Sequence, residues 1–310
     1  MSASLEARAA HEASFAGTIS RQILHRVPPI PSHISLRDKV AIVTGSSTGL
    51  GAECARQLLQ VQLSHLILAV RSQAKGEAVA SRLRAEYPKT HIEVWLLDME
   101  SYDSVRSFAA RCEKLDRLDL AILNAGCGKM HFTRCAGDNG REVTIQVNFL
   151  ATVLLAILLA PIIKDKGALE GEPRQSSRVP GRITIVISDM SFMVKLDENA
   201  PSILDSLDDP KTFDGLMQYG KSKLLLVMAV SKLALAVNPD DCTINLVNPS
   251  GTKGTELMRE AEALLPRFFV WLSTLLLGRN LEDGTRQYLH AALVFGKESH
   301  GSWCDYKIRP

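Results

Sequence analysis

From residue 39 onward, the chain alternates between short apolar runs and longer stretches whose apolar positions recur at helical spacing. Short apolar runs are typical of buried strands, and the longer stretches indicate helices. Because the two kinds of segment alternate at a short period, the pattern predicts right-handed crossovers and an α/β fold, with a single doubly wound parallel sheet and helices on both faces. The expected strands are 39–44, 65–70, 92–97, 118–123, 183–187, 243–247 and a short one within 303–308, and the expected helices are 49–60, 72–87, 101–115, 140–163, 218–237, 255–277 and 282–295.

The pattern also divides the chain into an extension and a main domain. Residues 1–36 stand apart, with one amphipathic helix expected within Leu5–Leu24 and a proline-rich connector after it. Residues 37–310 form the main domain. Within it, the polar excursion 189–217 is expected to form a flap over the substrate, and the apolar segment 251–280 is expected to form a lid.

Composition narrows the class of protein. The 310 residues are 46% hydrophobic, and the net charge of +2 comes from 36 basic and 34 acidic residues without long blocks, which argues against a nucleic acid partner. Six cysteines show no C-x-x-C spacing, so we expect a reducing compartment and no metal site. Glu6 and Glu12 argue against a secretory peptide, and the apolar run Phe149–Ile163 contains Pro161 and is short for a membrane span. We therefore expect a soluble, cytoplasmic protein.

A glycine-rich loop connects the first expected strand to the first expected helix. A strand that enters a helix through such a loop directs backbone N–H groups and a helix N-terminus at one point, which suits a pyrophosphate. The spacing is Gly-x-x-x-Gly-x-Gly, and not the dinucleotide fingerprint Gly-x-Gly-x-x-Gly. An ordinary strand–helix turn is the alternative. The candidate cofactor residues of this loop are Gly45, Ser47, Thr48, Gly49, Leu50 and Gly51.

The end of the second expected strand bears on the choice of cofactor. Arg71 follows Val70 directly, and no acidic residue comes after it until Glu77. An acidic residue in this region would receive the ribose of NAD, whereas an arginine accommodates the 2′-phosphate of NADP. A solvated arginine at a helix start is the alternative, and we favour NADP(H).

The next two strand ends supply further candidates. Asp98 and Met99 follow the third strand, where a carboxylate can accept a hydrogen bond from the adenine amino group; the alternative for Asp98 is a helix N-cap. Asn124, Ala125 and Gly126 follow the fourth strand. Small residues there leave room for a cofactor, and the Asn124 amide can tie neighbouring strands together.

Tyr219 and Lys223 form the sharpest chemical signal. They are four residues apart at the start of an apolar helix, so they share one face. A lysine cation beside a tyrosine favours the phenolate and lowers the tyrosine pKa from its reference of about 10, which makes a general acid or base. Ser188 ends a strand and can bind the reacting oxygen. Asn148, a lone amide in an apolar helix, either makes a structural hydrogen bond or links a proton relay to Lys223.

Together these residues resemble the short-chain dehydrogenase/reductase family, in particular the retinol-dehydrogenase-like members of fungal biosynthetic pathways. The resemblance runs from about residue 37 to 310. It implies a Rossmann-type fold and NAD(P)-dependent hydride transfer between an alcohol and a ketone. In that pattern Tyr219 would donate or accept the proton, and Lys223 would lower its pKa and hold the nicotinamide ribose. The resemblance implies that Ser188 orients the carbonyl, that Asn148 links a water to Lys223, and that Pro249 and Thr255 contact the cofactor.

The chain departs from the family pattern in three places. Asp189 follows Ser188 where many members have a second serine; we favour Ser188 as the catalytic serine because the residues after it match the family. The separation between Ser188 and Tyr219 is longer than usual, which is the reason to expect a flap at 189–217. After Pro249 the family usually has glycine, whereas here Ser250 follows.

The sequence thus favours an NADP(H)-dependent oxidoreductase that acts on a ketone or secondary alcohol in secondary-metabolite biosynthesis. The apolar segment Leu257–Leu277 favours a lipophilic substrate, although plain packing explains the same pattern. A same-fold enzyme for a non-redox step, such as a cyclisation or isomerisation, and a non-catalytic binding protein remain as alternatives. The apolar helices 147–163 and 222–237 suggest a homodimer face, which the flap could instead cover in a monomer.

Overall fold

The computed structural model describes residues 17, 22, 26–137, 140–167, 180–254, 278–305 and 307–309. Its strands form one sheet in the order β3-β2-β1-β4-β5-β6-β7-β8. All neighbouring pairs from β3 to β7 are parallel, and β7 pairs with β8 antiparallel. The strands are β1 Val40–Thr44, β2 His65–Val70, β3 His91–Leu96, β4 Leu120–Leu123, β5 Gly181–Val186, β6 Cys242–Val247, β7 Trp303–Cys304 and β8 Ile308–Arg309.

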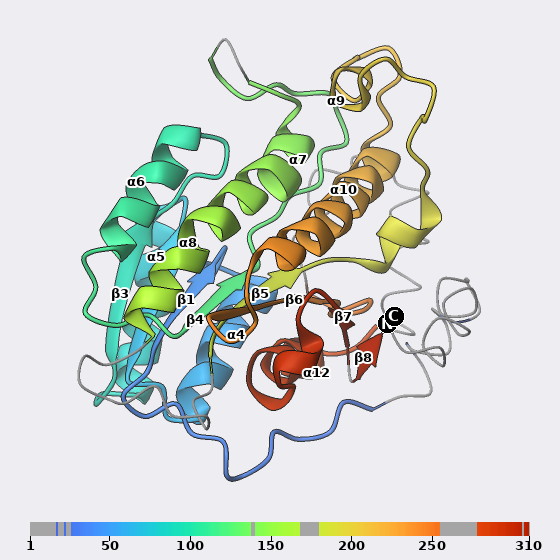
Figure 1. The fold of residues 1–310 in the computed structure, drawn as a ribbon. Helices are drawn as coiled ribbons and strands as arrows, with labels where there is room; N and C mark the ends of the chain where they lie inside the picture. Colours follow the sequence, from blue (N-terminus) through green and yellow to red (C-terminus); the bar gives the residue numbers. More distant parts are fainter. Residues whose placement is uncertain are drawn as a thin grey trace.

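Helices cover both faces of this sheet, as the alternating pattern predicted (Figure 1). Helices α6, α8 and α10 bury their apolar residues on one face, and α4, α5 and α12 bury theirs on the other. The α-helices are α4 Gly49–Gln60, α5 Gln73–Glu86, α6 Tyr102–Cys112, α7 Val143–Ile145, α8 Thr152–Lys166, α9 Ile203–Ser206, α10 Gly215–Ala236 and α12 Leu281–Leu289. The other helical segments are the π-helical η1 Gln146–Ala151 and η3 His290–Val294 and the 3₁₀-helical η2 Asp189–Met193 and η4 Lys297–Ser299.

The central strands show why the sequence forms this sheet. Every residue of β1, β4, β5 and β6 is buried. A parallel sheet that is covered on both faces needs apolar side chains at consecutive positions, and the short apolar runs supply them. The doubly wound prediction is therefore confirmed. One detail differs: the single short strand expected within 303–308 is two strands, joined by a turn in which Asp305 N donates to Lys307 O at 3.0 Å.

Two helix boundaries also differ from the prediction. The helix expected at 140–163 runs from Val143 to Lys166 and includes the π-helical turn η1. The helix expected at 218–237 begins at Gly215, because Asp214 caps it by accepting a hydrogen bond from Met217 N. The flap is thus shorter at its C-terminal end than the polar pattern indicated.

The helical stretch Val143–Lys166 is long and apolar enough to cross a membrane. It is also mostly internal, since 67% of its most apolar window is buried inside the fold. Leu155, Leu159 and Ile163 of α8 have no exposed area in the core against the sheet. Packing against the sheet therefore accounts for its apolar character.

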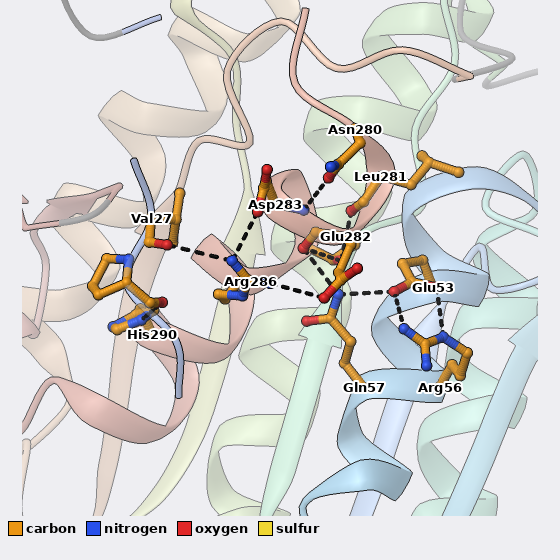
Figure 2. A network of polar contacts seen from close by, with 12 residues as sticks. Val27, Glu53, Arg56, Gln57, Asn280, Leu281, Glu282, Asp283, Arg286 and His290 are labelled. Carbon is orange, nitrogen blue, oxygen red and sulfur yellow. Dashed lines mark hydrogen bonds and ion pairs between the residues drawn. The ribbon is translucent and has the colours of Figure 1, made fainter. Parts of the chain in front are cut away.

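A polar interface joins α4 to α12 beneath the glycine loop (Figure 2). Gln57 is 4% exposed, and its Nε2 donates to Glu53 Oε1 and to Glu282 O, both at 2.9 Å, and also to Thr285 Oγ1. Buried amides are stable only when they are hydrogen-bonded in this way. Because α4 begins in the glycine loop, these contacts fix that loop relative to α12.

The N-terminal connector packs on the same helix. Arg286 Nη1 donates to Val27 O at 3.4 Å, and His290 Nε2 lies 2.9 Å from Pro28 O (Figure 2). Gln22 exchanges two hydrogen bonds with the backbone of Gly251, at 2.8 and 2.9 Å. The predicted helix Leu5–Leu24 otherwise lies outside the described residues, as does most of the predicted lid 251–280.

Candidate active site

The glycine-rich loop has a backbone that favours glycine at specific positions. Gly45 and Gly49 have φ values of +65° and +54°, in the left-handed region. A Cβ at Gly45 would lie 2.9 Å from Ala125 Cα, and a Cβ at Gly51 would lie 2.3 Å from Gly45 O. These contacts bring the start of α4 close to β1 and to the end of β4, as a dinucleotide-binding turn requires.

The start of α4 offers donors that fit a pyrophosphate. Thr48 is the N-cap, and its side chain makes no capping hydrogen bond. The first N–H groups of a helix have no partner within the helix, and they form an anion site. Ser46 is fully buried, and its Oγ has no hydrogen-bond partner in the part of the chain that the structure describes. The loop, with Ser47 and Leu50 beside it, therefore fits the phosphates of a nicotinamide cofactor.

Asn124 ties this loop to the sheet. Its Nδ2 donates to Thr44 O at 3.0 Å and to Gly45 O at 3.2 Å, and its Oδ1 accepts from Tyr288 Oη at 3.1 Å. Tyr288, on α12, is completely buried, and burial raises its pKa well above the ordinary value. The Asn124 amide is thus used structurally, and the next residue adds a further tie to β1, because Ala125 N donates to Thr44 Oγ1 at 2.9 Å.

Arg71 lies at the end of β2, and 60% of its side chain is exposed. Its Nη1 forms an ion pair with Glu100 Oε1 at 2.6 Å. No acidic residue follows Arg71 in the sequence before Glu77, but the fold supplies one, because parallel pairing of β2 with β3 brings the segment after β3 beside Arg71.

Asp98 shapes the turn that follows β3. Its Oδ1 accepts from Glu100 N at 3.0 Å, and its backbone N donates to Ser104 Oγ at 2.9 Å. The N-cap of α6 is Ser101, which accepts from Ser104 N, so Asp98 is not the cap. Met99 is buried, with 6% of its surface exposed.

Tyr219 and Lys223 lie one turn apart on α10 and are both buried, at 9% and 4% exposed. Lys223 Nζ lies 5.8 Å from the centroid of the Tyr219 ring and donates to Val186 O at 2.9 Å. Ser188 follows β5 and interacts with the Tyr219 hydroxyl, while its Oγ accepts from Met190 N at 3.3 Å. The structure thus brings the tyrosine and the serine together, and the lysine joins them at the end of β5.

The protonation of this pair differs from the sequence expectation. Burial raises the pKa of Tyr219 to about 12, although the interaction with Ser188 acts to lower it. Burial lowers the pKa of Lys223 to about 8. The predicted lowering of the tyrosine pKa by the lysine is therefore absent from this structure, because burial dominates and the Lys223 ammonium points at Val186 O. Tyr219 is held as a neutral phenol at neutral pH.

Asn148 lies in the π-helical turn η1 and is completely buried. Its Oδ1 accepts from Cys127 N at 2.8 Å, and its Nδ2 donates to Cys127 O at 2.8 Å and to Ser222 Oγ at 3.0 Å. All of these partners are structural. A Cβ at Gly126 would lie 3.2 Å from Asn148 Oδ1 and 3.6 Å from Lys223 Nζ, so both groups border the same glycine.

A buried carboxylate organises the start of α10. Glu142 has no exposed area, and it accepts hydrogen bonds from Thr144 N, Ile145 N and Gln218 Nε2 at 2.9, 3.1 and 3.1 Å. Gln218 Nε2 also donates to Leu207 O of the flap at 2.7 Å. Because Gln218 precedes Tyr219, this network connects the flap, α7 and the tyrosine that the sequence predicts to be catalytic.

Charged groups hold the rest of the flap. Arg141 Nη1 lies 2.6 Å from Asp205 Oδ1 and 2.7 Å from Asp208 Oδ2, and Glu142 N donates to Asp208 Oδ1 at 2.7 Å. Beside these groups is a cavity of about 660 Å³, which is also lined by Tyr102 and by none of the predicted catalytic residues. The charged lining does not suit a lipophilic substrate.

The structure places nearly all of the predicted site residues along the carboxyl ends of β1 to β6, although Thr255 lies outside the described residues. Pro249 is buried, and its carbonyl accepts from Gln287 Nε2 at 3.0 Å and Thr252 Oγ1 at 3.2 Å. Sequence reasoning missed Glu100, Glu142, Gln218 and Tyr288. Only Gln218 carried a signal, as the neighbour of Tyr219; the others depend on contacts distant in sequence.

Comparison with known proteins agrees with this geometry. The sequence model of the short chain dehydrogenase family matches residues 39–193. The chain is 45% identical to short chain dehydrogenase virL of Hypocrea virens, over 100% of this chain and 88% of that protein. It is also 45% identical to short chain dehydrogenase opdN of Penicillium oxalicum, over 97% of each.

Solved structures share the fold at lower identity. A short-chain type dehydrogenase/reductase from Mycobacterium marinum superposes with a TM-score of 0.65 at 21% identity, over 87% of this chain and 94% of that one. A short-chain dehydrogenase from Sphingobium yanoikuyae, in complex with NADPH, gives a TM-score of 0.59 at 22% identity, over 81% and 83%. From its glycine loop, its sheet order and its identity to full-length relatives, the chain belongs to the short-chain dehydrogenase/reductase family of oxidoreductases that use a nicotinamide cofactor.

Proposed function

We propose that the protein transfers a hydride between NADP(H) and a ketone or secondary alcohol of a lipophilic small molecule. The observation that carries this proposal is the meeting of Ser188, Tyr219 and Lys223 at the end of β5. Ligands of open α/β sheets bind outside the carboxyl ends of the strands, so these side chains lie where a substrate would meet a cofactor held by the glycine loop.

The bound nicotinamide supplies the hydride in the reducing direction. Tyr219 gives its proton to the carbonyl oxygen as the carbonyl carbon accepts the hydride, and the product is an alcohol. The pKa of about 12 keeps Tyr219 protonated at neutral pH, so its hydroxyl holds the proton to be given. This value lies above the range near neutrality that favours general acid catalysis, so the transfer requires stabilisation of the phenolate. Ser188 donates a hydrogen bond to the same oxygen. Lys223 would stabilise the phenolate that the proton transfer leaves behind only if its ammonium turns from Val186 O toward the Tyr219 oxygen.

Arg71 supports NADP(H) over NAD(H). It occupies the end of β2, where an acidic residue would bind the ribose hydroxyls of NAD. Its side chain is 60% exposed, so the guanidinium can bind a 2′-phosphate once it exchanges its pairing with Glu100 for that contact.

An apolar ledge beside Ser188 supports a lipophilic substrate. Phe192 and Met193 of η2 are 41% and 45% exposed, and the Phe192 ring stacks on Trp303 at a centroid distance of 4.5 Å. Exposed apolar side chains next to reacting groups favour substrates with apolar bodies. With its fungal relatives, this favours an enzyme of secondary-metabolite biosynthesis.

Calorimetric titration of the purified protein with NADPH and, separately, with NADH tests the cofactor assignment first. We expect tight NADPH binding and weak NADH binding. Lipophilic ketones are then offered with NADPH, and oxidation of NADPH is followed together with the product mass. Binding of neither cofactor would contradict the proposal. A product with the substrate's mass would point to an isomerisation or cyclisation on the same fold.

We also propose a homodimer through the outer surfaces of α8 and α10. Both helices are strongly apolar. Their outer surfaces expose three large apolar side chains, because Ile157, Met228 and Leu235 are 48%, 51% and 82% exposed. Burying these side chains against a second copy would remove them from water. Sedimentation analysis should show a dimer that Leu235→Glu weakens; a wild-type monomer would contradict this arrangement.

A further inference from the structure

Two histidines and a glutamate meet at the opposite edge of the sheet from Tyr219. His65 begins β2 and pairs in register with His91, which begins β3, while Glu93 lies two residues further along β3. Cross-strand partners and residues two apart point to the same face of a sheet. One ligand atom from each of the three lies within 4.8 Å of the others.

The contact distances are close to those of a metal site. Glu93 Oε1 lies 2.8 Å from His65 Nε2 and 3.9 Å from His91 Nε2. Ligands of a tetrahedral zinc ion, each about 2.0 to 2.2 Å from it, lie about 3.3 to 3.6 Å apart. One of the two measured distances is shorter than that spacing and the other is longer, so small side-chain movements would bring the three ligand atoms to the spacing of a zinc site.

The surroundings prepare these groups to bind a cation. Trp95 Nε1 donates to Glu93 Oε2 at 3.1 Å, which leaves Oε1 directed at the histidines. A hydrogen bond of this kind, which orients a ligand from behind, is typical of metal sites.

We propose that His65, His91 and Glu93 bind one Zn²⁺ ion, with water completing its coordination. Two imidazoles and one carboxylate are a known zinc ligand set. The ion would join β2 to the edge strand β3 and stabilise that edge of the sheet. This departs from the expectation of no metal site, which rested on the spacing of the cysteines; strand pairing, which that spacing does not reveal, assembles the cluster.

Two features of the cluster oppose the binding of Zn²⁺ and therefore limit its affinity. The His65 and His91 rings stack at a centroid distance of 4.3 Å, so the His91 ring has to tilt to point its nitrogen at the ion. Its side chain is 66% exposed, which permits that rotation. Arg111 Nη2 lies 3.6 Å from Glu93 Oε2, and its positive charge disfavours a cation. We therefore expect reversible binding that a chelator removes.

Titration of the untagged, EDTA-treated full-length protein with ZnCl₂ tests the proposal. We expect one ion per chain, a rise in the unfolding temperature, and loss of both in His91→Ala, whose exposed side chain is not needed for folding. Trp95→Phe, which removes the donor to Glu93, should weaken binding about ten-fold. His33→Ala, at an exposed histidine elsewhere, is the control.

Cobalt(II) provides a second measurement that excludes the cysteines. Bound at this site it should give weak visible absorption without the strong charge-transfer band of a thiolate ligand. Saturable Zn²⁺ binding that survives His91→Ala, a thiolate band, or no saturable binding by the wild type would each overturn the proposal. Because the cluster lies at the other end of the strands, His91→Ala should leave NADPH binding unchanged.

Discussion

The proposed cofactor side of this site, at the glycine loop, and the proposed substrate side, at the flap, are held together by different forces. On the cofactor side, buried strands and close backbone contacts fix the glycine loop, where a Cβ at Gly51 would lie 2.3 Å from Gly45 O. On the substrate side, hydrogen bonds and ion pairs hold the flap through Arg141, Glu142 and Asp208. Close backbone packing leaves the glycine loop little conformational freedom, whereas a single substitution can remove a hydrogen bond or ion pair from the polar network of the flap.

This difference teaches where specificity can change within one fold. On the cofactor side, the glycine turn itself is formed by residues near one another in sequence, from β1 through α4, and Asn124 and α12 hold it from farther along the chain. The flap depends on partners such as Glu142 and Gln218, which are 76 residues apart. Altering the flap therefore leaves the sheet and the glycine loop intact, and the substrate can vary while the cofactor chemistry stays the same.

The largest effect is expected at the junction of the two sides. Tyr219→Phe removes the proposed proton donor, so turnover of a ketone with NADPH should fall about 10²- to 10⁴-fold. NADPH affinity should change little, because the glycine loop is untouched. Steady-state kinetics and calorimetric titration measure the two quantities, with Tyr87→Phe on the far side of the domain as the control. Turnover close to wild type would show that the proton comes from elsewhere.

Much of the cofactor side could be predicted from the sequence. Apolar runs fix the buried strands, and the positive φ values of Gly45 and Gly49 match glycines already visible in the loop. Tyr219 and Lys223 are one helical turn apart, so their common face follows from spacing alone. These features are local, and a sequence records local geometry directly.

The remaining features depend on which segments meet after folding. Glu100 reaches Arg71 only because β2 pairs with β3, and Asn148 is satisfied by Cys127 and Ser222. The raised pKa of Tyr219 arises from its burial, which residue spacing cannot reveal. The sequence named the reacting groups, but the partners that set their protonation came from the tertiary structure.

Glu142→Gln tests the polar network of the substrate side and should have the second-largest effect. An amide nitrogen would replace one carboxylate oxygen and face an N–H donor, at a cost of about 1–3 kcal/mol in the free energy of unfolding. Urea denaturation measures this cost, with the exposed Glu86→Gln as the control. We also expect a higher KM for the ketone and an unchanged Kd for NADPH. Equal stability of the two variants would argue against a structural role for the carboxylate.

Arg71→Ala tests the cofactor side, and unlike Glu142→Gln it should change cofactor binding and not the stability of the flap. Losing one guanidinium–phosphate contact should raise the Kd for NADPH about ten-fold, which corresponds to about 1.4 kcal/mol of binding free energy. This is near the lower end of the free energy that a charged hydrogen bond contributes, because Arg71 is mostly exposed. NADH binding and the stability of the flap should not change. Arg82→Ala, at an exposed arginine on α5, provides the matched control. If the preference between NADPH and NADH is the same in both variants, another residue selects the cofactor.

Glu100→Gln should have the smallest effect and the opposite sign. The Arg71–Glu100 pair is partly exposed, so breaking it costs only about 0.2–1 kcal/mol, and releasing Arg71 should tighten NADPH binding about two-fold. The gain should shrink as salt is added, and it should vanish in the Arg71→Ala background, because the glutamate then has no guanidinium to withhold. Weaker NADPH binding in the single variant would instead mean that Glu100 positions Arg71 for the phosphate. The cofactor side would then depend on a polar contact as much as the substrate side does.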